Sequence, residues 1–182
     1  VIAGDYRQQR PQSSPAVTID GDDRPLGAER RPLAALASVH PSGMTEAQWA
    51  VASVLKRTGG TWSTYLSRLR MAGRIIEQND LYYVSEKGLA ELGAQVSPMP
   101  PPGPALVQFW TGKIAAIGPM LNRLADIYPN WTTREQLAAD LNLTAGAGTF
   151  STYLSRLRSP GLIEEDREGN VRASPQLMER AA

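Results

Sequence analysis

The eight residues Ser-Thr-Tyr-Leu-Ser-Arg-Leu-Arg occur twice in this chain, at positions 63–70 and again at positions 151–158. The match continues on both sides of the octapeptide at a constant offset of 88 residues. The further residues that recur are Pro41, Thr45, Gln48, Ala50, Leu55, Gly60, Thr61, Gly73, Ile75 and Glu77, matched by Pro129, Thr133, Gln136, Ala138, Leu143, Gly148, Thr149, Gly161, Ile163 and Glu165. Similarity at a fixed period marks a duplicated structural unit. Since 182 residues are enough for two small domains, the sequence predicts two copies of one fold.

Changes in composition predict the boundaries of the two copies. Residues 1–26 mix Gly, Pro, Gln, Ser and Asp, which is typical of a flexible N-terminal tail or linker, with one short extended segment expected at 16–19. Residues 96–104 are rich in proline and predict a semi-rigid linker. The first domain is therefore expected at 27–95, and the second, with an extra leading helix, at 105–182.

In the first copy, the residue pattern predicts three helices followed by a hairpin. Pro41 must end the first helix, and Thr45 with Gln48 three residues later is the capping-box pattern that begins the second. Thr61 is expected to cap the third helix, and Gly73 to end it. The expected elements are helices at 27–40, 45–55 and 61–73, strands at 75–78 and 81–84, and a closing helix from 85 or 86 to 92.

The second copy repeats this order. Thr132 or Thr133 is expected to cap its second helix, and Gly148-Thr149 to open its third. The remaining elements are an extra helix at 105–117 ended by Gly118-Pro119, a first helix at 121–127, a third helix ending at Gly161, and strands at 162–165 and 171–173. Phe109 and Trp110 of the extra helix are expected to pack between the domains. The fold class predicted is mainly α with small β wings: two tandem winged-helix domains joined by a Pro-rich linker.

The third helix of each copy divides into an apolar face and a polar face. At about 100° per residue, the apolar face carries Trp62, Tyr65, Leu66 and Leu69 in copy one, and Phe150, Tyr153, Leu154 and Leu157 in copy two. The opposite face and its flanks carry small hydroxyl residues and arginines. Such side chains suit a helix in a DNA major groove, because hydroxyls bond bases or phosphates and arginine binds phosphate or guanine bidentately. A solvated helix face has a similar composition, and remains the alternative.

The distribution of charge favours the DNA interpretation, and it favours copy one. The net charge is only +1, so basic residues have to be clustered to attract nucleic acid. The stretch 56–74 contains Lys and Arg without Asp or Glu, whereas a solvated face usually mixes the two signs. Copy two keeps fewer arginines and continues into the acidic residues 164–166. Copy one is therefore expected to be the stronger DNA contact, and copy two an auxiliary contact or a protein-binding surface.

The candidate DNA-binding residues come from both copies. In the first they are Lys56, Arg57, Thr61, Ser63, Thr64, Ser67, Arg68, Arg70 and Arg74; in the second they are Thr149, Ser151, Thr152, Ser155, Arg156 and Arg158. The second wing adds Arg167 and Arg172 within reach of a phosphate or a minor groove.

The sequence offers little for catalysis or for binding a metal. Cysteine is absent, and His40, the one histidine, is expected to be structural because its counterpart is Tyr128. No apolar run approaches the ~20 residues that span a bilayer. We therefore expect a non-enzymatic protein without catalytic residues, metal or cofactor, located in the cytoplasm with the nucleoid.

Several short segments resemble a known family. These segments are 103–110, Tyr128-Pro129, Gly148-Thr149-Phe150, 154–158 and Gly161-Leu162-Ile163. They are similar to the paired winged-helix modules at the carboxyl ends of some bacterial and phage HerA/FtsK-like DNA-translocating ATPases, and the resemblance covers roughly residues 27–182. It implies a DNA-associated role and a motor domain upstream. The chain begins with Val, which we expect either of a piece of a longer protein or of a processed product, and it contains no G-x-x-x-x-G-K-[ST] motif for nucleotide hydrolysis.

The leading hypothesis is a module that binds double-stranded DNA through the third helix of each copy. The alternative, from a different class, is a scaffold for protein–protein interaction or self-association. A third interpretation is that the chain is the carboxyl-terminal part of a larger DNA-translocating ATPase.

Overall fold

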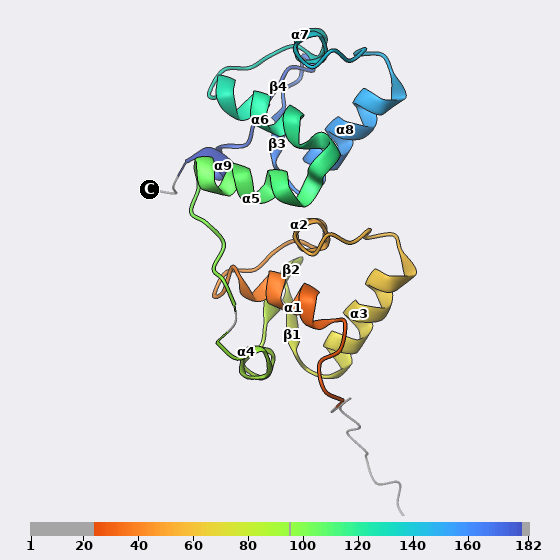
Figure 1. The fold of residues 1–182 in the computed structure, drawn as a ribbon, viewed down its shortest axis with the longest axis vertical. Coiled ribbons are helices and arrows are strands. Elements are labelled where there is room, and N and C mark those ends of the chain that lie inside the picture. Colours follow the sequence, from red (N-terminus) through yellow and green to blue (C-terminus); the bar gives the residue numbers. More distant parts are fainter. Residues whose placement is uncertain (1–23, 95, 180–182) are drawn as a thin grey trace, which may run out of the picture.

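The computed structural model describes residues 24–94 and 96–179, and it is mainly helical with two small antiparallel hairpins (Figure 1). In copy one the elements are α1 (Arg30–Ala37), α2 (Glu46–Ala52), α3 (Gly60–Met71), β1 (Ile75–Gln78), β2 (Leu81–Val84) and α4 (Glu86–Leu92). In copy two they are α5 (Pro104–Ile114), the 3-10 turn η1 (Ala115–Ile117), α6 (Gly118–Ile127), α7 (Arg134–Asp140), α8 (Gly148–Arg158), β3 (Ile163–Glu165), β4 (Val171–Ala173) and α9 (Pro175–Met178). Two units with the order helix, helix, helix, hairpin are consistent with winged-helix-like domains. The tail predicted at 1–26, with its extended segment at 16–19, lies outside the described residues except for 24–26.

The helix starts follow from local hydrogen bonds. Thr45 and Gln48 form the predicted capping box: the Thr45 hydroxyl accepts from the Gln48 amide at 3.2 Å, and the Gln48 side chain accepts from the Thr45 amide at 3.0 Å. In copy two Thr133, not Thr132, is the cap, and its hydroxyl accepts from the Gln136 amide at 3.1 Å. The prediction that Thr61 caps the third helix is wrong, because α3 already begins at Gly60.

Buried apolar residues of both copies belong to one core cluster, to which each copy contributes a part. In copy one Trp49 packs edge-on against Trp62, with ring centroids 4.9 Å apart, and its indole N–H donates to the carbonyl of Pro32 at 2.6 Å. Tyr82 is buried against Trp49, whereas Tyr83 is half-buried; burial raises the pKa of Tyr82, and the nearby Glu77 carboxylate raises it further. The corresponding core of copy two contains Leu121, Leu124, Leu137, Phe150, Leu157 and Val171.

The hairpins pair in register within each copy. In copy one Ile75 lies opposite Val84, and in copy two Ile163 lies opposite Ala173. An isolated bridge joins each hairpin to the loop before the second helix, between Met44 and Tyr82 in copy one and between Thr132 and Val171 in copy two. The same contact therefore ties the wing to the helices in both copies.

The start of copy two differs from the prediction. The extra helix ends at Ile114, and Gly118-Pro119 begins α6 instead of ending the extra helix, because a proline in the first helical turn lacks only an amide that would have had no helical partner. A Cβ on Gly118 would approach the Thr111 side chain to 2.7 Å, so glycine permits the close crossing of α5 and α6. The short helix α9, which packs on α5, follows no predicted pattern.

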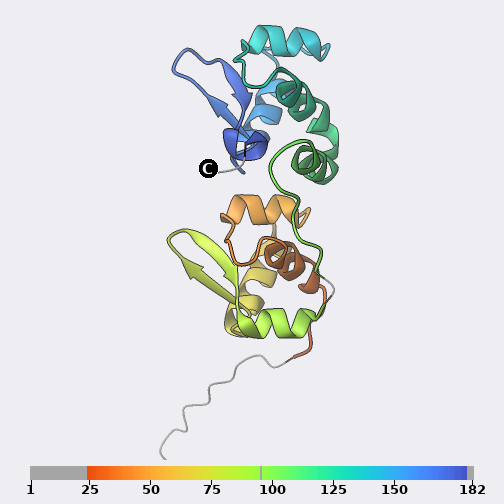
Figure 2. The ribbon, with the colours of Figure 1, turned by 90° about the vertical axis from the view of Figure 1, so that its left-hand side faces the viewer.

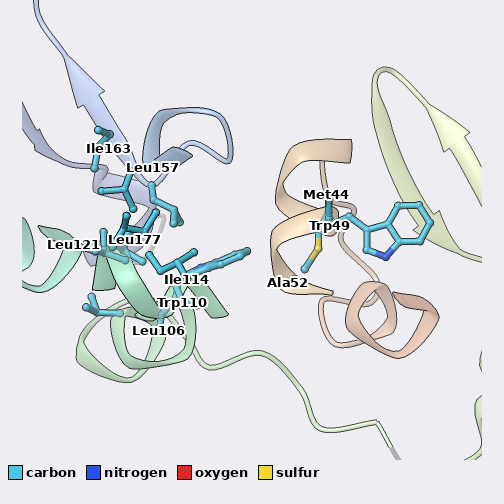
Figure 3. Packing of buried hydrophobic residues seen from close by; sticks show 14 of the residues in the cluster. Met44, Trp49, Ala52, Leu106, Trp110, Ile114, Leu121, Leu157, Ile163 and Leu177 are labelled. Carbon is cyan, nitrogen blue, oxygen red and sulfur yellow. The ribbon is translucent and has the colours of Figure 1, made fainter. Parts of the chain in front are cut away.

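α5 also lies at the junction between the copies. It contacts α2 of copy one as well as α6 and α9 of copy two. Figure 3 shows residues of the buried cluster from both copies facing each other, with Trp110 and Ile114 of α5 on the side toward Ala52 of α2. Trp110 is buried and meets Phe109 edge-on, with ring centroids 5.4 Å apart. Copy two therefore rests on copy one through its leading helix.

Candidate nucleic-acid interface

The third helices α3 and α8 place their apolar residues in the core, as predicted. Trp62 and Leu69 are buried in copy one, and Phe150, Leu154 and Leu157 in copy two. The Tyr and Leu positions that complete this face, Tyr65, Leu66 and Tyr153, are half-buried. This packing determines which face of each helix is exposed to solvent.

The hydroxyl residues of both helices are exposed on that outer side. They are Thr61, Ser63, Thr64 and Ser67 in copy one and Thr149, Ser151, Thr152 and Ser155 in copy two. The Thr64 hydroxyl donates to the carbonyl of Gly60 at 2.9 Å, and the equivalent Thr152 hydroxyl donates to the carbonyl of Gly148 at 2.7 Å. Because their protons point into the helix, these two oxygens present acceptor lone pairs to the outside.

In the fold, the arginines of the stretch 56–74 lie close to carboxylates. Arg57 lies 3.8 Å from Glu46 of α2, Arg68 lies 4.0 Å from Glu29, and Arg70 bonds Glu77 of β1. The stretch lacks acidic residues in sequence, but the fold brings a carboxylate to each of these arginines from another segment. Exposed pairs of this kind contribute about 0–1 kcal/mol each, so a phosphate can replace the carboxylate.

Arg74 does not belong to the interface, and its prediction as a DNA-binding residue is wrong. Its side chain is buried, bonds the Glu91 carboxylate at 2.8 Å and donates to the carbonyl of Arg24. Its counterpart in copy two is Leu162, which is also buried. The repeat alignment therefore contained the signal that position 74 is a core position, because an apolar residue takes its place in copy two.

In copy two the last arginine of the octapeptide has a structural role. Arg158 bonds Glu165 of β3, as Arg70 bonds Glu77 in copy one, and Glu165 also accepts from Arg134 of α7. The shared Arg and Glu join the end of the third helix to the first strand of the wing. Sequence reasoning missed this role, although the recurrence of both residues seven positions apart was the available signal.

Lys56 and Arg156 are exposed, and within the described part of the chain neither has a carboxylate at ion-pair distance. They meet in a groove of about 570 Å³ at the junction of the copies. The groove has an apolar floor from α2, the α2–α3 turn and Ile114, and its four cationic lining residues are Lys56, Arg57, Lys113 and Arg156. No acidic residue lines it among those the structure describes. Three chain segments far apart in sequence thus combine their positive charge.

The two wings differ in their polar contacts. Arg172 in wing two bonds Glu164 at 2.8 Å and stacks 4.4 Å above the Trp131 ring, so it is held against its own domain. The turn of this wing is held by Asp166, whose carboxylate accepts from the amides of Glu168 and Asn170. The Asn170 side chain, together with these amides, holds the pKa of Asp166 below its usual value. Arg167 is exposed beside this turn.

Residues 24–94 and 96–179 contain no group of three His, Cys, Asp or Glu side chains placed to hold a metal ion. None of the helices in these ranges combines the length and the apolar character needed to cross a membrane.

Comparison of the chain with protein-family models, with curated proteins and with solved structures finds no match.

Proposed function

We propose that this chain is a non-enzymatic module that binds double-stranded DNA, with two winged-helix units that present α3 and α8 to the duplex. The observation that carries the proposal is the groove at the junction, where four cations from both copies lie together without an acidic residue among the described lining. A site of this kind attracts a polyanion, and the neighbouring hydroxyl faces of α3 and α8 provide acceptors for base edges.

The ion pairs of copy one change the expected ranking of the copies. Arg57, Arg68 and Arg70 each have a carboxylate close by, which lowers their net attraction for phosphate. Lys56 and Arg156 have none at ion-pair distance among the described residues. The proposal therefore assigns the main phosphate contacts to one cation from each copy, instead of to copy one alone.

Binding to a duplex over a series of salt concentrations tests the proposal. The logarithm of the affinity should fall linearly with the logarithm of the salt concentration, because each neutralised phosphate releases counterions. Lys56→Gln and Arg156→Gln should each reduce the slope by about one. Arg123→Gln, which removes an exposed arginine paired with Asp140 on the α6–α7 side, is the matched control and should leave the slope unchanged. Affinity that is independent of salt would overturn the proposal.

A second candidate function, protein association, is favoured by apolar residues on the surface of copy one. Met71 is 64% exposed and Ile76 is 52% exposed, whereas the equivalent residues of copy two are Ser159 and Glu164. Exposed large apolar side chains are candidates for an interaction site. Importing the residues of copy two, as Met71→Ser with Ile76→Glu, should abolish concentration-dependent self-association in sedimentation if this surface mediates it. An unchanged sedimentation profile would remove this candidate.

A further inference from the structure

The arrangement of the two copies bears on the layout of the DNA site. We propose that the chain reads one continuous duplex as a direct repeat, with both copies bound in the same strand polarity, and not as a palindrome. This inference rests on the proposed function, and it adds the form of the DNA that the interface accepts.

The orientation of the copies is visible in the two ribbon views. In Figure 1, α3 and α8 lie along the same edge of their domains and run in the same direction, and α2 and α7 lie at the same end. In Figure 2 both hairpins project on the same side and point the same way. The copies are therefore related by a shift along the long axis, without the reversal that a twofold axis would produce.

Contacts at both ends of the linker restrain this orientation. The amide of Met99 donates to the carbonyl of Ser38 in copy one at 2.7 Å, and the amide of Gly103 donates to the carbonyl of Leu177 in copy two at 2.9 Å. The prolines between them limit the backbone further, since each fixes one dihedral angle. α5 also rests on α2, so the copies are held together by side-chain packing as well as by the linker.

Symmetry of the protein determines symmetry of the site. Twofold protein dimers read palindromes, because the axis reverses the strand polarity of one half-site. A shift preserves polarity, so two similar third helices read two similar half-sites in the same direction. For both helices to reach the major groove from one side of the duplex, the half-site centres must be about 10–10.5 base pairs apart, or a multiple of this.

The cations at the junction lie where this geometry requires phosphate contacts. Lys56 and Arg57 come from the turn that leads into α3, Arg156 comes from α8, and Lys113 comes from the end of α5. Together they line the groove at the junction of the copies, and on a direct repeat they hold the backbone that connects the half-sites. Lys113, which also lies 5.2 Å above the Phe109 ring, is thereby added to the DNA contacts.

Selection from random duplexes with the intact chain provides the half-site for the first test. Duplexes of equal length and composition then carry two half-sites as a direct repeat, as an inverted repeat, or as a direct repeat with about 5 extra base pairs. The direct repeat should bind about 100-fold tighter than either of the others, because only there do both copies engage at once. Equal affinities with normal salt dependence would overturn the direct repeat while leaving DNA binding intact. Selection that returns no pair of motifs would overturn it as well.

The absence of cysteine allows a second test that reports polarity directly. Gln78→Cys in the first wing and Glu168→Cys in the second, each at an exposed position, take an iron chelate that cuts nearby DNA. On the selected site the two labelled proteins should cut on the same side of their respective half-sites, with the two cuts separated by the spacing of the half-sites. Cuts displaced in opposite directions, cutting from only one wing, or a uniform ladder along the duplex would each contradict a direct repeat. Absence of salt-dependent binding to any duplex would instead refute the proposed function.

Discussion

The two copies share an octapeptide and a backbone arrangement, but they fill equivalent positions with different chemistry. Copy one has the aromatic core residues Trp49, Trp62 and Tyr82, where copy two has Leu137, Phe150 and Val171. Copy one buries Arg74 where copy two buries Leu162. The comparison shows that this fold depends on which positions are buried and on the backbone contacts, and not on particular side chains at those positions.

The same comparison separates the roles of the octapeptide residues. Its leucines face the core in both copies, and its last arginine pairs with the glutamate seven residues later in both. Its middle arginine differs: Arg68 lies 4.0 Å from Glu29, whereas the position equivalent to Glu29 is Ile117 in copy two. Arg156 is therefore left to the groove. Identity of sequence thus corresponds to identity of fold, while the surroundings decide which arginine is available for a ligand.

The largest expected effect is on the aromatic core of copy one. Trp49→Ala should reduce the free energy of unfolding of copy one by about 3–5 kcal/mol, since it removes a fully buried ring and an indole hydrogen bond. Trp49→Leu, which installs the residue of copy two, should recover part of this loss. Hydrogen exchange of the β2 amides measures copy one, and exchange of the β4 amides serves as the internal control. Equal costs for Ala and Leu would show that the two cores are not equivalent in packing.

The next effect concerns the buried arginine. Arg74→Ala should cost about 2–3 kcal/mol in urea unfolding, because it leaves a cavity and removes a charged partner from the partly buried Glu91. Arg74→Leu should cost less, since Leu162 fills the same position in copy two. DNA affinity of Arg74→Leu should stay within about twofold of the parent. A loss of DNA affinity as large as that caused by Lys56→Gln would show that Arg74 does contribute to DNA binding.

A smaller effect compares free and paired cations in DNA binding. The double variant Lys56→Gln with Arg156→Gln should lower duplex affinity by about tenfold at moderate salt, since both phosphate contacts are lost. The double variant Arg70→Gln with Arg158→Gln should lower it less than threefold, because these side chains are held by Glu77 and Glu165. Fluorescence anisotropy with a labelled duplex measures both. A larger loss of affinity in the Arg70 and Arg158 variant would show that the arginines at the ends of the third helices make the main DNA contacts.

The smallest effect is a difference in acid sensitivity between the wings. The pKa of Asp166 is lowered in the folded chain by its bonds from Asn170 and the turn amides. Its contribution to stability is therefore present above the unfolded pKa and is lost as the pH falls through the folded pKa, below about 4. The amides of wing two should then exchange faster at acid pH, an increase that Asp166→Asn should abolish. The turn of wing one, Asn79-Asp80, serves as the comparison; equal acid sensitivity of both wings would contradict the role of Asp166.

Much of the fold was predictable because its signals are local. The capping box at Thr45, the turn at Asn79-Asp80 and the end of the third helix near Gly73 each depend on residues a few positions apart. One error arose where tertiary contacts decide. α9 forms against α5, whereas the helix start at Gly118-Pro119 had a local signal, a proline in the first turn, that the prediction took for a helix end.

The candidate site was predictable only in part. The exposure of the hydroxyl face follows from the helical period, and the structure confirms it. The partners of the arginines were not predictable, since Glu29, Glu46 and Glu77 reach them from other segments. The groove that brings Lys56 and Arg156 together depends on how one copy rests on the other, which no local pattern encodes.

By itself the sequence determined that the chain contains the same unit twice, which helix of each unit is amphipathic, and which residues face the core. These features follow from the helical period and from helix caps, which depend on interactions between residues only a few positions apart. Only the tertiary structure decided that Arg74 is buried, that Arg70 and Arg158 are tied to the wings, and that both third helices point the same way. Those outcomes depend on side-chain packing and ion pairs between segments that are distant in the chain.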